Sequence, residues 1–91
     1  MENIKNTINA LIQEGKYNDA LVSINAYLAE NQNSDEAWFL AGNVYRKMEN
    51  WQGAMNAYIK AMDINPESPA KAAYGMIVSI LDFYDKNRYN Q

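Results

Sequence analysis

The amino-acid sequence nearly repeats itself after 34 residues, and this period limits the folds open to the chain more than any other feature. The shift lays identical residues on one another and keeps bulky apolar positions in phase, as with Asn9 on Asn43, Ala20 on Ala54 and Ile24 on Tyr58. A fixed period of about 20 to 50 residues is typical of stacked repeats, whose units bury their apolar faces against one another. The sequence therefore predicts a stack that presents a surface and performs no chemistry.

Each repeat contains two stretches in which apolar residues recur at three- and four-residue spacing, the pattern of an amphipathic helix. The four stretches cover residues 4–12, 20–28, 38–45 and 54–62. No run rich in Pro, Gly or Ser divides the chain into separate folding units. We therefore expect short helices stacked in one continuous domain, residues 1–91.

Turn-forming residues predict where these helices end. Gly15 is suited to the left-handed conformation that ends the first helix, and Asn50 to the corresponding turn of the second pair. Breaks between helix pairs are expected at residues 31–34 and 65–68, where Asn, Ser and Pro gather.

The segment from Trp38 to Pro66 resembles the tetratricopeptide repeat, a helix pair with the pattern W-x2-L-G-x2-Y, then A-x3-F, then A and P. The matching residues are Trp38, Gly42, Tyr45, Ala54, Ala61 and Pro66, with Ala41 at the usual Leu position and Tyr58 at the usual Phe position. Residues 1–34 match more weakly, as a terminal repeat does. The resemblance implies an all-α, right-handed superhelical solenoid of five antiparallel helices: repeats at 1–34 and 35–68, then a C-terminal capping helix and tail at 69–91.

The smallest residues of the pattern are expected to set how closely the helices approach. Gly42 and Ala54 have little or no side chain, so the helices of the second pair can come close there, and larger residues would cost about 1–3 kcal/mol in strain. Trp38 should lie between the helices of its own pair. We interpret the aromatic residues at these spacings as core rather than as a ligand cage.

Composition argues against several classes of function. The net charge is −3, and the chain has neither His, the side chain most used as a general acid or base, nor the Cys/His set of a structural metal site. We therefore expect no enzyme activity, no cofactor and no metal. Basic residues are not clustered, which argues against nucleic acid. No stretch fits a signal peptide or a membrane span, so a cytoplasmic protein without a membrane partner is predicted.

The resemblance implies that function lies on the concave face, which the first helix of each pair lines. The residues expected to contact a partner there are Lys5, Asn6, Asn9, Phe39, Leu40, Asn43, Arg46 and Tyr74. This face is mildly basic and rich in amides, so we predict that it holds a peptide or a partner helix, with a preference for an acidic segment. The alternative is a solvated helix face whose amides bind only water.

Ser68 as an N-cap before Pro69 predicts a fifth helix that starts at Pro69 and runs to about Asp85. This helix is apolar nearly all round, and such helices are normally covered on all sides. Its inward face is expected to consist of Ala72, Gly75, Met76 and Ser79. The residues then left for a second contact are Ile77, Ile80, Leu81 and Tyr84.

Three coverings of this second face are open: a partner protein, a second copy of the chain, or the tail at residues 83–89 folding back. The sequence therefore predicts a protein-interaction module that binds through its concave groove or its C-terminal helix. The alternative is a self-assembling, homodimeric structural module without a separate ligand.

Overall fold

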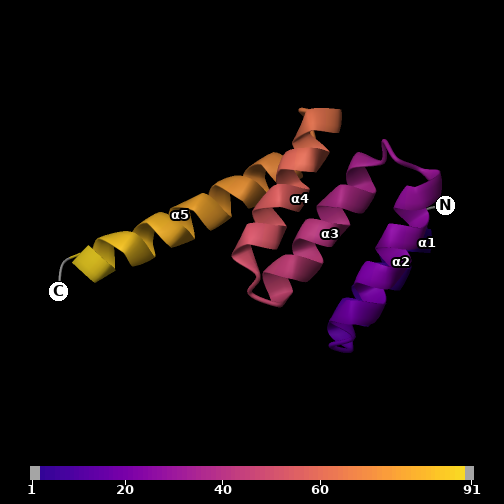
Figure 1. Cartoon of the computed structure of the whole chain (residues 1–91), viewed down its shortest axis with the longest axis horizontal. Helices are drawn as coiled ribbons and strands as arrows, with labels where there is room; N and C mark the ends of the chain where they lie inside the picture. Colours follow the sequence, from indigo (N-terminus) through magenta and orange to yellow (C-terminus); the bar gives the residue numbers. More distant parts are fainter. Residues whose placement is uncertain (1–2, 90–91) are drawn as a thin grey trace.

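The computed structural model describes residues 3–89, with side chains from residue 4 to residue 83, and contains five α-helices and no strand within those residues. The helices are α1 (Asn3–Gln13), α2 (Tyr17–Glu30), α3 (Asp35–Lys47), α4 (Trp51–Ile64) and α5 (Ala70–Tyr89). Helices α3 and α4 form an antiparallel hairpin, α1 and α2 lie beside α3, and α5 leaves the stack at an angle (Figure 1). The predicted all-α stack of helix pairs is confirmed.

The turns within the two helix pairs share one backbone geometry. Gly15 has a φ of 76°, and the amide of Lys16 donates at 2.9 Å to the carbonyl oxygen of the residue five positions earlier. In the second turn Glu49 has a φ of 61°, and the amide of Asn50 makes the equivalent bond at 2.9 Å. These bonds satisfy carbonyl groups that the end of a helix leaves free. The predicted role of Gly15 is confirmed.

Asn50 takes part in the second turn through its amide, but it is not the left-handed residue of that turn. Glu49 takes the left-handed conformation, because Glu49 is the residue that the repeat shift lays on Gly15. Asn50 caps α4 instead, and its Oδ1 accepts from the amide of Gly53 at 3.0 Å. A short amide side chain is well suited to that position, since it satisfies a free N–H of the first turn.

A serine side chain caps the N-terminus of the helix that follows each break between pairs. Ser34 Oγ accepts from the amide of Ala37 at 3.1 Å, and Ser68 Oγ accepts from the amide of Ala70 at 3.0 Å. Helix α5 thus begins one residue after the predicted start at Pro69.

The C-terminal end of α5 differs from the prediction. The helix continues past Asp85 to Tyr89, because no Gly or Pro follows Gly75 to end it.

The core consists of two apolar clusters. The first joins α1, α2 and α3 and includes Ala57 of α4, and its largest buried residues are Ile8, Ile24, Leu28, Leu40 and Val44. The second joins α4 to α5 through Ala54, Tyr58, Ala61, Ala70, Ala73 and Ile77. Trp38 and Tyr45 of α3 pack against both clusters, so α3 connects the two halves of the molecule.

Helix α5 buries a different face from the one predicted. Ala70, Ala73 and Ile77 are the buried residues, whereas the predicted inward residues Ala72, Gly75, Met76 and Ser79 are exposed. The side chain of Met76 is 55% exposed, and nothing lies within 4 Å of a Cβ built on Gly75.

Comparison of α5 with α3, 34 residues earlier, explains why α5 buries a different face. The predicted face of α5 corresponds to Trp38, Gly42 and Tyr45 of α3, which turn toward α4, the following helix of the same pair. Within residues 3–89 no helix follows α5, so that face has nothing to pack on. Helix α5 therefore buries the face that meets the preceding helix, α4.

We expect Glu49→Gly to raise the free energy of unfolding by about 1 kcal/mol. The left-handed conformation costs a residue with a Cβ about 1–2 kcal/mol, and glycine avoids this cost. Glycine also makes the unfolded chain more flexible, which offsets part of the gain in stability. Urea denaturation followed by circular dichroism measures the difference.

The reciprocal control is Gly15→Ala. A Cβ at position 15 would have nothing within 4 Å, so only the backbone conformation should lower stability, by about 1 kcal/mol. A less stable Glu49→Gly protein would contradict this account of the turn.

Candidate functional site

Tyrosine rings and glycines interlock the two helices of the second pair. Tyr58 of α4 is fully buried, and its ring lies directly over Gly42 of α3, where a Cβ would overlap the ring. In the reverse direction the ring of Tyr45 lies over Gly53, and a Cβ there would be 2.9 Å from Cδ1 of that ring. The predicted close approach at Gly42 is present, and the group that fills it is the ring of Tyr58.

The side chain of Tyr58 lies beside three predicted groove residues of α3. Its Oη donates to Asn43 Oδ1 at 2.5 Å, and the centroid of its ring lies 5.9 Å from that of Phe39. Arg46 is close enough for its charge to act on the phenol. Phe39, Asn43 and Arg46 are all partly exposed, so the tip of a buried side chain organises part of the surface.

The Tyr58 phenol remains protonated at neutral pH. Burial raises the pKa of Tyr58 above its ordinary value of 10.0, and the positive charge of Arg46 opposes that rise. The hydroxyl is therefore a permanent hydrogen-bond donor to Asn43 under physiological conditions.

Next to this cluster a hollow of about 340 Å³ lies between α1, α3 and the start of α5. Its lining residues are Lys5, Asp35, Glu36, Phe39, Leu40, Ser68 and Pro69. The structure thus brings Lys5 of the first repeat to the same hollow as Phe39 of the second. Asp35 and Glu36 also line it, so the basic character predicted for the groove does not extend to this end.

The other predicted groove residues differ in their exposure. Lys5, Asn6 and Asn9 are exposed on α1, and Tyr74 of α5 is partly buried against the second core cluster. Leu40 is only 2% exposed and belongs to the first core cluster, and the small part of it that remains accessible lines the hollow.

Only some of the residues predicted to form the contact face of α5 are exposed. Ile77 is fully buried in the second core cluster, because it is part of the face that packs on α4, and it cannot contact a partner. Leu81 is partly buried against the same cluster, and Ile80 is 38% exposed. The side chain of Tyr84 lies outside the described side chains.

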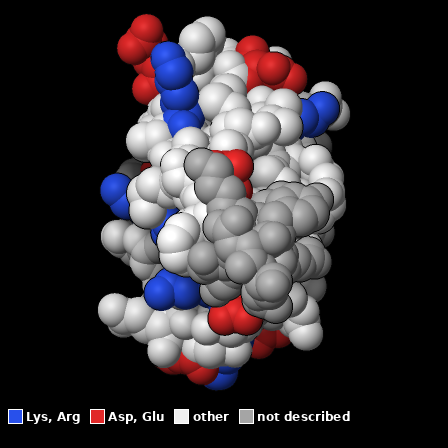
Figure 2. All heavy atoms as spheres, turned by 90° about the vertical axis from the view of Figure 1, so that its left-hand side faces the viewer, with Lys and Arg blue, Asp and Glu red and all other residues white. Residues whose placement is uncertain are grey.

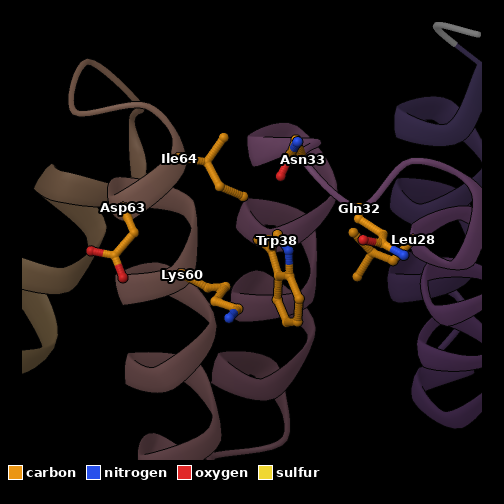
Figure 3. A pocket seen from close by; sticks show the side chains of 7 residues that line it. All are labelled: Leu28, Gln32, Asn33, Trp38, Lys60, Asp63 and Ile64. Carbon is orange, nitrogen blue, oxygen red and sulfur yellow. The ribbon is translucent and has the colours of Figure 1, made fainter.

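A second hollow, of about 400 Å³, lies at the junction between the two helix pairs. Figure 3 shows Lys60 reaching from α4 toward the Trp38 ring on α3, with Leu28 and Gln32 on the far side of that ring. Lys60 Nζ lies 5.8 Å from the centroid of the ring, close enough for a cation–π contact.

The Trp38 side chain in this second hollow lies between the two helix pairs. Trp38 Nε1 is buried and has no hydrogen-bond partner within the described part of the chain. Such a group costs about 1–3 kcal/mol, and it is sealed from any acceptor outside. The sequence had placed Trp38 between the helices of its own pair, and here it also joins that pair to α2.

Sequence reasoning missed Tyr58, which bonds to Asn43 of the groove, and Lys60, which lines the second hollow. The repeat pattern marks Tyr58 only as a core position, at the site of a usual Phe. Its hydroxyl was the available signal, since a buried phenol needs a hydrogen-bond partner. No comparable signal marked Lys60, which is one of only two charged residues of α4.

Charges show no dominant patch in the view that Figure 2 presents, where Lys and Arg are interspersed with Asp and Glu. Among the described side chains, residues 4–83, no group of three or more acidic, His or Cys residues could hold a metal ion. In the same part of the chain, no helix is long and apolar enough to cross a membrane.

The fold and the groove define an α-helical solenoid of paired-helix repeats. The family model for the tetratricopeptide repeat matches residues 11–77, and the chain belongs to that family. Among solved structures, the solution NMR structure of the Bacteroides fragilis protein BF1650 is similar, with a TM-score of 0.83 and 43% sequence identity. That match covers 100% of this chain and 92% of that chain. A search of the curated proteins finds no match.

Gly42→Ala should lower the free energy of unfolding by about 1–3 kcal/mol, because the new methyl group overlaps a ring that is buried on all sides. Thermal and urea denaturation both report this loss.

Gly75→Ala is the matched control on an exposed helix. A Cβ at position 75 has open space, so the higher helix propensity of alanine should leave stability unchanged or raise it by up to about 1 kcal/mol. Equal effects of the two substitutions on stability would mean that the packing of the Tyr58 ring does not require a glycine at position 42.

Proposed function

We propose that this chain is a protein-binding module that holds a peptide or a partner helix against the face formed by α1 and α3. Tetratricopeptide repeats generally mediate protein–protein interactions and are not catalytic, which supports this class of function. The observation that carries the proposal is the gathering of Phe39, Asn43 and Arg46 around the side chain of Tyr58.

The chemistry of this face fits a partner with an apolar side chain beside an oxygen acceptor. The hollow between Lys5 and Pro69 has Phe39 in its wall and can receive the apolar side chain. Beyond Phe39 along α3, Asn43 supplies an amide and Arg46 a cation. An acidic segment suits this end of the groove, because charged partners strengthen a hydrogen bond. Asp35 and Glu36 disfavour a second carboxylate in the hollow itself.

Replacing Lys5 and Arg46 together by Glu should weaken binding of an acidic probe about tenfold, which corresponds to about 1.4 kcal/mol. The probe is a short, fluorescently labelled peptide of alternating Glu and Leu residues, and fluorescence anisotropy measures its affinity. We expect the wild-type affinity to fall with salt, since exposed charges are screened.

The control is the double variant Lys16→Glu, Lys71→Glu, which makes the same change in net charge at exposed sites outside this face. Equal loss in both double variants would show that only overall charge matters, and the groove would be rejected as the binding site.

A second candidate function is self-association through α5. The face of α5 that corresponds to the α4-covered face of α3 is exposed: Met76, which corresponds to Gly42, is 55% exposed. Ile80, one turn further along the helix, is 38% exposed. Another helix is the element that covers this face in the preceding repeat. The occupant proposed is α5 of a second copy, which would bury the same stripe on both chains.

Light scattering over a dilution series should then show a dimer that dissociates at low concentration. Met76→Lys combined with Ile80→Lys should give a folded monomer at every concentration, because two buried charges oppose association. Val22→Lys combined with Ile59→Lys changes two exposed apolar residues elsewhere and should leave the dimer intact. A wild-type monomer at high concentration would exclude this candidate.

A further inference from the structure

The side-chain amide of Asn43 is held in one orientation by a buried residue. Tyr58 Oη donates to Asn43 Oδ1 at 2.5 Å, and the ring that carries this hydroxyl is fixed by burial over Gly42 and beside Phe39. The oxygen and nitrogen of a planar amide point in different directions. Since Oδ1 turns toward the buried hydroxyl, Nδ2 turns away from it, and Asn43 has two N–H groups to offer a partner.

We propose that Tyr58 sets the hydrogen-bonding polarity of the groove, so that at Asn43 the groove selects an oxygen acceptor, either a main-chain carbonyl or a carboxylate, over a donor. This inference rests on the proposed function and specifies the chemistry of the ligand at one position. Tyr58 acts through Asn43 and is a positioning residue.

Arg46 gives this part of the groove the same polarity. A guanidinium group donates hydrogen bonds and accepts none. Arg46 is near enough to Tyr58 for its charge to lower the pKa of the phenol against the effect of burial. Asn43 and Arg46 lie three residues apart on α3, so they share one side of the helix. Together they present donors only.

The reverse orientation of the amide is less favourable. With Nδ2 donating to Tyr58 Oη, the hydrogen of the phenol would need another acceptor in a buried place. Leaving a buried donor without a partner is costly. The observed bond satisfies the hydroxyl and orients the amide at the same time.

The first repeat has no equivalent of the hydrogen bond between Tyr58 and Asn43, so it provides an internal control. The repeat shift lays Asn9 on Asn43 and Ile24 on Tyr58. Ile24 is fully buried and has no hydroxyl, and Asn9 is exposed. The amide of Asn9 is therefore free to offer its oxygen or its nitrogen. Two amides that are equivalent in the sequence differ in the structure.

A double-mutant cycle between Tyr58→Phe and Asn43→Asp tests the proposal with the acidic Glu–Leu probe. Asn43→Asp replaces the donors by acceptors and should reduce affinity about tenfold. Tyr58→Phe keeps the ring and frees the amide to populate both orientations, which should reduce affinity about threefold. In the Asn43→Asp background, Tyr58→Phe should have no further effect, since coupled residues are not additive.

Asn9→Asp is the matched control, and its effect should add to that of Tyr58→Phe because these residues share no contact. A version of the probe with Gln in place of Glu separates the two sources of the acceptor. If Asn43→Asp weakens both probes, the acceptor is a main-chain carbonyl; if it weakens the acidic probe alone, the acceptor is a carboxylate.

Two results would overturn the polarity proposal. The first is that Tyr58→Phe reduces the affinity for the probe equally in the wild type and in the Asn43→Asp variant. That result would reject the role of Tyr58 without rejecting the groove as the binding site. The second test uses the free protein and needs no ligand. We expect the side-chain amide resonances of Asn43 in a ¹⁵N NMR spectrum to shift in the Tyr58→Phe variant. Unchanged resonances would show that the hydroxyl does not hold the amide. Failure of the groove as a whole is reported separately by the Lys5 and Arg46 double variant.

Discussion

The packing of the Tyr58 ring onto the bare backbone at Gly42 is the interaction on which the rest of the structure depends. It sets the distance between α3 and α4, and the Tyr45 ring over Gly53 repeats it in the opposite direction. Protein interiors are close-packed, so a ring that replaces a missing side chain leaves no room for an added methyl group. The same placement carries the Tyr58 hydroxyl to Asn43, and the packing of the core thereby determines part of the surface chemistry.

The two helix pairs are joined through α3, whose Trp38 and Tyr45 contact both core clusters. Stability in a stacked-repeat protein comes from such contacts between neighbours. The joint has a cost, because Trp38 Nε1 is buried without a partner within the described residues. At the other end of the stack, α5 packs through Ala73 and Ile77 and leaves Met76 exposed. This asymmetry is why the groove and α5 are separate candidates for binding.

The sequence predicted much of the fold and less of the candidate site. Helix pairs, the left-handed Gly15 and the capping Ser68 follow from local rules that act within a few residues. Groove residues such as Lys5 and Asn43 were proposed from a family pattern, and the structure shows their surroundings without testing their role. Leu40 is mostly buried, because one residue along a helix turns the side chain by about 100° and separates an exposed groove residue from a core residue.

The sequence by itself determined which segments are helices and how they pair, because spacing of apolar residues and turn chemistry are local properties. Only the tertiary structure decided which face of α5 is buried and what the Tyr58 hydroxyl holds. The first depends on whether another helix follows in space, and the repeat pattern assumes one that the described residues do not contain. The second depends on a contact between residues of different helices, Asn43 and Tyr58, whose side-chain directions are fixed only once α3 and α4 have packed.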